Sequence, residues 1–281
     1  MDSSQLATMK KVISKDGTPI AFDQSGKGPA VIFVGGAFQH RAIDPRTAQL
    51  AARLEPHFTV FHYDRRGRGD SGDTAPYAVE REVEDIEALI TEAGGSAFVF
   101  GMSSGAVLAL KAAAHGLAIT KLALYEPPFN LDDNARPASE NYTKQLTALL
   151  AEGRRGDAVA LAMTTFGAPA EAVAGMRETP IWSMFESVAP TLAYDNAIMG
   201  DGSVPSERMA SVTVPTLVID GGASPAFMHN AAQAAADALP NAQRRTLEGQ
   251  THDVAPEALA PVLEEFFSGV VAMIYQPDKK G

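Results

Sequence analysis

The sequence predicts an α/β fold, a doubly wound and mostly parallel sheet with helices on both faces and an inserted helical segment. Short, nearly all-apolar runs such as residues 30–34 and 216–220 are typical of strands that are buried on both faces. These runs alternate with stretches of helical length, and such alternation produces parallel crossover units. Between Pro127 and Val214 the alternation stops and the pattern is helical, which predicts the insertion.

The expected elements begin with a hairpin, in which residues 10–14 and 19–23 flank a Lys-Asp-Gly-Thr turn. Strand-like apolar runs and helical patterns then follow in alternation. The expected later strands span residues 30–34, 59–63, 97–100, 120–125, 216–220 and 243–247. The expected helices of the core span residues 46–54, 79–93, 105–115, 226–239 and 256–267.

These elements predict two domains. Residues 1–128 and 212–281 are expected to form the core domain, and residues 129–211 a helical cap in the position of a lid. A chain of 281 residues, 46% of them hydrophobic, is long enough for a large α/β domain that carries an insertion.

Composition narrows the classes of partner. The chain has 23 Lys and Arg against 34 Asp and Glu, a net charge of −11, which disfavours nucleic acids and anionic membranes. It has no cysteine, which excludes disulfides and thiolate chemistry and disfavours structural zinc. The N-terminus lacks the apolar core of a signal peptide, and no run approaches the ~20 apolar residues of a membrane span. We therefore expect a cytoplasmic protein; its oligomeric state is not predicted.

Residues 101–105, Gly-Met-Ser-Ser-Gly, are the strongest chemical motif. They follow an expected buried strand and precede an Ala-rich helix. In a nucleophile elbow the strand and the helix nearly touch, so the flanking positions must be small, as Gly101 and Gly105 are. This context predicts Ser103 as a nucleophile, whereas an ordinary Gly/Ser loop is the alternative interpretation.

Two backbone N–H groups are expected to form an oxyanion hole. The helix behind Ser103 directs its free N–H groups toward the site, which makes Ser104 one candidate donor. The loop after residues 30–34 contains Gly35 and Gly36, whose small size lets the backbone approach a substrate oxygen. The second donor is assigned to Ala37, with Phe38 as the alternative.

Together these motifs resemble the α/β-hydrolase superfamily, in its serine-nucleophile form with a helical cap, over about residues 10–267. Gly-Gly at residues 35–36 stands where the family usually has His-Gly. Residues 63–71, Tyr-Asp-Arg-Arg-Gly-Arg-Gly-Asp-Ser, are similar to the family's D-x-R-G-x-G-x-S loop, and a structural turn is expected there rather than a phosphate patch or an adhesion tripeptide. The resemblance also includes residues 249–252, Gly-Gln-Thr-His.

The resemblance implies that His252 is the base of a catalytic triad. It lies in a polar loop after the last expected strand, where the family places its histidine. The other five histidines lack this context, and they are expected at the surface or in packing. Among them His40 is expected to reach the pocket, because it follows the oxyanion loop.

The position of the triad's carboxylate residue departs from the family pattern. The usual position, aligned through Gly221, holds Ser224, whose hydroxyl cannot supply the charge. Glu126 follows the strand at residues 120–125, and in open α/β sheets ligand chemistry takes place at such strand ends. Certain haloalkane dehalogenases resemble this arrangement, so Glu126 is favoured, and Asp220 is the alternative acid.

A serine nucleophile predicts hydrolysis of a carboxylic ester, lactone or thioester without a cofactor or a metal. Epoxide hydrolysis and dehalogenation of the family's aspartate-nucleophile type are disfavoured, because both need a carboxylate at position 103. The substrate is expected to be small to medium in size and apolar. The residues expected to line its pocket are Phe38, His40, Met102, Trp182 and Phe185.

Two alternatives stay open at this point. The same fold and triad also serve lyases, C–C bond hydrolases and cofactor-free haloperoxidases. Without a working acid, the chain would instead be a non-catalytic protein that binds or senses a small molecule.

Overall fold

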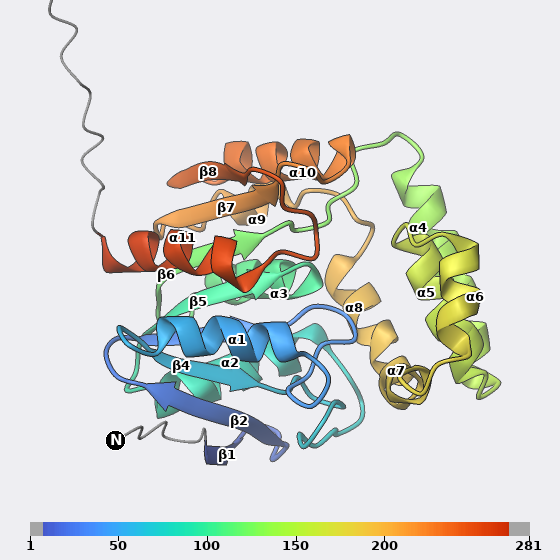
Figure 1. The fold of residues 1–281 in the computed structure, drawn as a ribbon, viewed down its shortest axis with the longest axis horizontal. Coiled ribbons are helices and arrows are strands. Elements are labelled where there is room, and N and C mark those ends of the chain that lie inside the picture. Colours follow the sequence, from blue (N-terminus) through green and yellow to red (C-terminus); the bar gives the residue numbers. More distant parts are fainter. Residues whose placement is uncertain (1–7, 270–281) are drawn as a thin grey trace, which may run out of the picture.

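An eight-stranded sheet forms the centre of the computed structural model, which describes residues 8–269 (Figure 1). Its strand order is β1-β2-β4-β3-β5-β6-β7-β8. The first two strands form the predicted antiparallel hairpin, β2 also runs antiparallel to β4, and all later pairings are parallel. The strands are β1 (Thr8–Ile13), β2 (Pro19–Gly26), β3 (Ala30–Val34), β4 (Thr59–Tyr63), β5 (Ala97–Met102), β6 (Ile119–Tyr125), β7 (Thr216–Gly221) and β8 (Ala242–Leu247).

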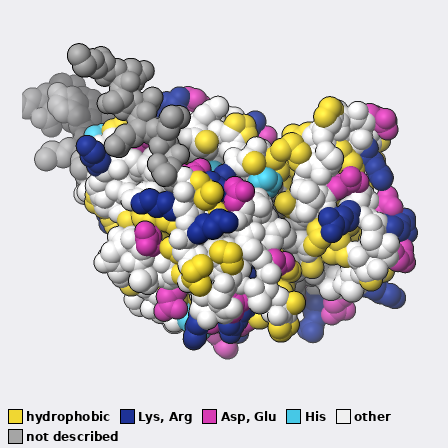
Figure 2. Space-filling view, turned by 90° about the horizontal axis from the view of Figure 1, so that it is seen from below, with side chains coloured by type: hydrophobic (Ala, Val, Ile, Leu, Met, Phe, Trp, Pro, Cys, Tyr) yellow, Lys and Arg dark blue, Asp and Glu magenta, His cyan; other side chains and the backbone are white. Residues whose placement is uncertain are grey.

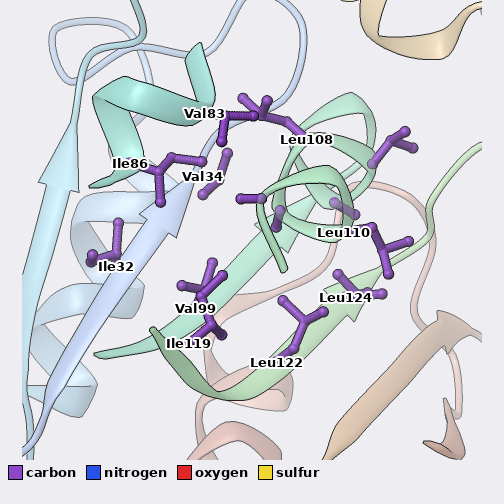
Figure 3. Packing of buried hydrophobic residues seen from close by; sticks show 14 of the residues in the cluster. Ile32, Val34, Val83, Ile86, Val99, Leu108, Leu110, Ile119, Leu122 and Leu124 are labelled. Carbon is purple, nitrogen blue, oxygen red and sulfur yellow. The ribbon is translucent and has the colours of Figure 1, made fainter. Parts of the chain in front are cut away.

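Helices cover both faces of this sheet, and the predicted doubly wound fold is confirmed. Successive strand residues point to opposite faces, so Ile32 packs with helices α2, α3 and α10, whereas Val31 packs with α1 and α11. Figure 3 shows part of the first cluster, with Ile86 of α2 and Leu108 of α3 over the strands. The covering helices are α1 (Pro45–Leu54), α2 (Val79–Glu92), α3 (Ser104–Ala114), α10 (Ala226–Ala238) and α11 (Pro256–Ser268).

The observed strands are slightly longer than expected where a neighbour continues. Strand β5 runs two residues beyond Phe100, because Met102 still pairs with Tyr125 of β6. This register brings Ser103 and Glu126 out side by side at the carboxyl ends of adjacent strands. The end segments of the predicted core domain, residues 1–7 and 270–281, lie outside the described residues.

A helical segment is inserted between β6 and β7. In Figure 1 helices α4 to α7 stand together at the end of the sheet toward which β6 and β7 point. They have a hydrophobic cluster of their own, which includes Leu146, Val159 and Trp182. The elements are α4 (Ala135–Ala151), α5 (Arg155–Thr165), α6 (Ala170–Arg177), α7 (Trp182–Val188), the 3-10 turn η1 (Ala189–Thr191), α8 (Leu192–Met199) and α9 (Ser206–Met209). That residues 129–211 form a lid domain stays a prediction.

Helix α8 connects the inserted segment to the core. Leu192 at its start belongs to the cluster of the insertion, whereas Ile198 near its end belongs to the sheet cluster. Its middle residue Asp195 is buried between the two.

Candidate active site

Ser103 lies on a sharp turn between β5 and α3. Its backbone has φ 55° and ψ −128°, a region that residues with a side chain rarely adopt. A Cβ added at Gly101 would lie 2.7 Å from Cα of Ala106, and one at Gly105 would lie 2.3 Å from the carbonyl oxygen of Val34. The strand and the helix therefore touch through both glycines, which is the steric demand of a nucleophile elbow.

Glu126 is fully buried directly after β6, where its backbone has φ 44°. Its Oε1 accepts hydrogen bonds from the backbone N–H of Gly221 at 2.8 Å and from the hydroxyl of Ser224 at 2.5 Å. Ser224, which stands at the position where the resemblance would place an acid, thus donates to the carboxylate of Glu126.

The imidazole of His252 meets the second oxygen of this carboxylate. Its Nδ1 lies 2.6 Å from Oε2 of Glu126. Burial disfavours the charged form of Glu126, but its hydrogen bonds outweigh that effect and hold its pKa below the ordinary value. Glu126 is therefore an anion at neutral pH and can only accept, so in the neutral form of the His252 ring the proton lies on Nδ1 and Nε2 is an acceptor.

The loop that carries His252 is fixed from β6 as well. The hydroxyl of Tyr125 donates to the carbonyl of Thr251 at 2.5 Å, and the backbone N–H of Ser103 donates to the carbonyl of Tyr125 at 2.9 Å. Tyr125 therefore connects the nucleophile turn to the histidine loop. The hydroxyl of Ser103 itself makes no hydrogen bond to any residue that the structure describes.

Asp220, the alternative acid, makes its side-chain hydrogen bonds to three other residues. Its carboxylate is buried, and His229, Arg244 and Thr246 donate to it, the first through Nδ1 at 2.5 Å. The structure brings Glu126, and not Asp220, into hydrogen-bond contact with His252.

Asp220→Asn is expected to leave kcat unchanged but to lower the free energy of unfolding at pH 7. The expected loss is about 2 kcal/mol, less than for a fully buried pair because Arg244 and His229 are partly exposed. Burial raises the pKa of Asp220, yet its hydrogen bonds outweigh this and keep it below the ordinary 3.8. A carboxylate with a lowered pKa stabilises the fold above its ordinary value, and this stabilisation is lost as the pH falls through the folded-state value.

The difference between wild type and Asp220→Asn in urea unfolding should therefore shrink as the pH falls below 3.8. A large fall in kcat in this variant, with native stability, would instead give Asp220 a part in the chemistry.

The predicted oxyanion loop lies directly beside the nucleophile. A Cβ added at Gly36 would lie 3.0 Å from Cβ of Ser103. The N–H of Gly36 is already used, since it donates to Oε1 of Gln39 at 2.6 Å. Ala37 is the next residue along the loop, and Phe38 has φ 65°. Ser104, the other expected donor, is the first residue of α3.

Backbone strain is concentrated in this one region. Among residues 8–269, the residues other than glycine with positive φ are Phe38, Ser103 and Glu126. They lie on the loop after β3, on the turn between β5 and α3, and directly after β6. Such conformations cost of order 1–3 kcal/mol each and cluster at sites where geometry serves function.

The expected pocket residues differ in their surroundings. The ring centroids of Phe38 and Phe185 lie 5.3 Å apart, edge to face, so the loop after β3 contacts α7. The sulfur of Met102 accepts a weak hydrogen bond from Gln39 at 3.7 Å. Trp182 is buried within the hydrophobic cluster of the insertion.

His40 is buried and follows the expected oxyanion loop in the chain. Its Nδ1 has no hydrogen-bond partner among the described residues. Burial is the main cause that lowers the pKa of His40, so the imidazole is neutral at pH 7.

In the space-filling view the molecule is hollowed between the insertion helices and the rest of the chain (Figure 2).

The arginine-rich loop after β4 is a structural turn. Arg65, Arg66 and Arg68 are at most 1% exposed, and each is paired with a carboxylate. Side chains that are buried and paired in this way cannot form a surface patch for phosphate.

Three contributors to this region were not found from the sequence: Gln39, Tyr125 and Asp195. Tyr125 acts through Thr251, which is distant in sequence, whereas Gln39 contacts Gly36 nearby and Met102 further along the chain. No sequence pattern marks either residue. Asp195 lies in Leu-Ala-Tyr-Asp-Asn-Ala-Ile-Met, where a single acidic residue resembles an ordinary solvent-facing position.

Within residues 8–269 no group of three or more His, Cys, Asp or Glu side chains is arranged to hold a metal ion. No helix in that same range combines the length and the apolar character needed to cross a membrane.

The chain is similar to known proteins over most of its length. A model of the alpha/beta hydrolase family matches residues 31–265. The crystal structure of an alpha/beta hydrolase from Sphaerobacter thermophilus DSM 20745 is 60% identical, with a TM-score of 0.85, over 92% of this chain and 100% of that one.

Two more distant structures share the fold. A hydrolase from Pseudomonas aeruginosa PA01 is 21% identical, with a TM-score of 0.71, over 95% of this chain and 99% of that one. A thermophilic esterase from Thermogutta terrifontis is 22% identical, with a TM-score of 0.72, over 94% and 99% of the two chains.

Proposed function

This chain belongs to the alpha/beta hydrolase family, and we propose that it is a serine hydrolase that forms an acyl-enzyme on Ser103. Its substrate would be a carboxylic ester, a lactone or a thioester of small to medium size and apolar character. The acid of the triad would be Glu126, displaced from the family's usual position.

The hydrogen bond between His252 and Glu126 supports this proposal most strongly. A triad acid must fix the imidazole tautomer and stabilise the imidazolium that forms when the serine loses its proton. Glu126 satisfies both demands, because it is buried, ionised and 2.6 Å from Nδ1 of His252. Ser224 and Gly221 hold the other carboxylate oxygen and so fix the direction of this contact.

The proposed reaction has two halves. In the first, Nε2 of His252 takes the hydroxyl proton of Ser103 as Oγ attacks the carbonyl carbon, and the N–H groups of Ala37 and Ser104 stabilise the oxyanion. The tetrahedral intermediate collapses, and His252 gives the proton to the leaving alcohol or thiol. In the second, water gives a proton to Nε2 of His252 as its oxygen attacks the acyl carbonyl carbon. The intermediate then collapses, the bond from the acyl carbon to Oγ breaks, and His252 returns the proton to Oγ of Ser103 as the acid leaves.

We infer an apolar substrate from the apolar side chains around Ser103. Met102 precedes the nucleophile, and its thioether is a weak hydrogen-bond partner. The aromatic pair of Phe38 and Phe185 adds apolar surface between the oxyanion loop and α7. We propose a small-molecule substrate without a nucleic-acid or membrane partner, on the charge balance of the chain; a cytoplasmic location stays a prediction.

Hydrolysis of p-nitrophenyl acetate, butyrate and octanoate by the purified chain tests this function. We expect a rate well above the uncatalysed one, with a higher kcat/KM for butyrate than for acetate because the longer acyl chain buries more apolar surface. If the chain hydrolyses none of these esters, nor a matched lactone and thioester, the proposal of acyl hydrolysis is wrong, and a binding role or C–C bond chemistry becomes the better account.

A further inference from the structure

A buried, charge-balanced cluster lies beside the candidate oxyanion hole. It contains two arginines of the loop after β4, Arg65 and Arg68, and two carboxylates, Glu82 of α2 and Asp195 of α8. All four side chains are at most 5% exposed. The carboxylate of Asp195 accepts hydrogen bonds from Ser104 and from the two arginines. Ser104 carries one expected oxyanion donor, and the arginines contact the loop that carries the other.

The first of these contacts is to the nucleophile turn. Oδ1 of Asp195 accepts a hydrogen bond from the hydroxyl of Ser104 at 2.7 Å. Ser104 opens α3, and its backbone N–H is one expected oxyanion donor. Asp195 thus holds the residue that carries this N–H.

The second contact reaches the other donor through an arginine. Oδ2 of Asp195 accepts from Nη2 of Arg68 at 2.6 Å, and Nη1 of Arg68 donates to the carbonyl oxygen of Gly36. That carbonyl and the N–H of Ala37 belong to one planar trans peptide unit, so they point in opposite directions. Fixing the Gly36 carbonyl toward Arg68 therefore fixes the Ala37 N–H on the opposite side.

Arg65 supports the same loop one peptide earlier. Its Nη1 donates to Oδ1 of Asp195 at 2.6 Å and to the carbonyl of Gly35 at 3.3 Å. Both arginines therefore lie between a single carboxylate and the backbone of the oxyanion loop.

We propose that Asp195 is a positioning residue that holds both backbone donors of the oxyanion hole in register, one through Ser104 and the other through Arg68. This inference rests on the proposed serine-hydrolase function. Because Asp195 lies on α8, the helical insertion supplies part of the support for the oxyanion hole and not only a cover for the substrate.

The protonation of Asp195 fits this role. Burial alone would raise its pKa, but the charges of Arg68 and Arg65 outweigh burial and lower it. The carboxylate is therefore ionised at neutral pH and accepts all three hydrogen bonds.

Asp195→Asn tests the proposal, with Asp85→Asn as the matched control. Asp85 pairs with Arg66 in a similarly buried ion pair of the same loop, at 2.7 Å, but none of its described contacts is to the oxyanion loop. Asp85→Asn removes a charged partner of one buried guanidinium, that of Arg66, whereas Asp195→Asn removes a charged partner of two, those of Arg65 and Arg68. Both variants are therefore expected to lose stability, and Asp195→Asn the more.

Only Asp195→Asn should lose activity. We expect kcat on p-nitrophenyl butyrate to fall about 10²-fold with little change in KM, as when one oxyanion donor is misplaced. The Ki of an alkyl boronic acid, whose tetrahedral adduct on Ser103 places an oxygen in the oxyanion hole, should rise by the same factor. Asp85→Asn should keep the wild-type kcat and Ki.

If Asp195→Asn does not fold, Ser104→Ala tests the positioning role of Asp195 in its place. It keeps the backbone N–H and the balanced charges, and it removes only the hydroxyl contact to Asp195. We expect kcat to fall roughly tenfold and the boronic acid Ki to rise in parallel, less than for removal of a whole donor.

The outcomes separate this inference from the proposed function. Wild-type kcat and Ki in a folded Asp195→Asn, or in Ser104→Ala if that variant alone folds, would overturn the positioning role while the hydrolase function stands. An equal loss in Asp85→Asn would also overturn it, since buried charge alone would then explain the effect. If the wild-type chain neither hydrolyses the ester nor binds the boronic acid, the proposed function itself fails.

Discussion

Replacing Ser103 with alanine or glycine is expected to lower ester hydrolysis roughly 10⁶-fold, the scale seen when the nucleophile of a triad is removed. His252 and the oxyanion donors stay in place in these variants, but no oxygen is left to form the acyl-enzyme. The measurement is kcat/KM on p-nitrophenyl butyrate with each purified variant.

The two replacements should differ in stability, which separates lost chemistry from lost structure. Ser103 has φ 55°, where a residue with a Cβ is strained and glycine is not. Ser103→Gly should therefore be more stable than Ser103→Ala by about 1 kcal/mol in urea unfolding, although both are inactive. Substantial hydrolysis by either folded variant would show that another group attacks the substrate.

Replacing Glu126 with glutamine is expected to lower kcat about 10⁴-fold, as loss of the triad acid does. An amide is nearly the same size, but its NH₂ group can donate to Nδ1 of His252 and so favour the wrong tautomer. It also carries no charge to stabilise the imidazolium. Burst and steady-state kinetics on the same ester measure the effect.

Ser224→Ala is the matched control for this variant. It removes one hydrogen bond to Oε1 of Glu126 but leaves the charge and the contact to His252. Its kcat should fall by about tenfold at most, since a single hydrogen bond to a charged group is lost. Near wild-type kcat in a folded Glu126→Gln would mean that Glu126 is not the acid.

Much of the core could be predicted from the sequence because its signals are local. The apolar run at residues 30–34 and the glycines around Ser103 each follow from neighbours in the chain, and the structure has β3 and the elbow at those residues. The end of β5 was less predictable, because its last two residues are set by pairing with β6.

The site depends more on contacts between distant residues. Strand-end geometry was enough to favour Glu126, but the hydroxyl of Ser224 that donates to it comes from 98 positions further along the chain. Asp195 meets Arg65 across 130 positions, so no local pattern could mark it as buried. The place of Trp182 could not be predicted either. An aromatic residue in an inserted helix gives the same sequence pattern whether its side chain packs in a core or lines a pocket.

Intact mass of the wild-type chain after exposure to a fluorophosphonate tests the central claim most directly, with Ser103→Ala and Glu126→Gln treated in parallel. An activated serine should gain one phosphonyl group per chain, with fluoride as the leaving group. We predict complete labelling of the wild type, none of Ser103→Ala and much slower labelling of Glu126→Gln. An unlabelled wild type, or labelling that persists in Ser103→Ala, would contradict the account.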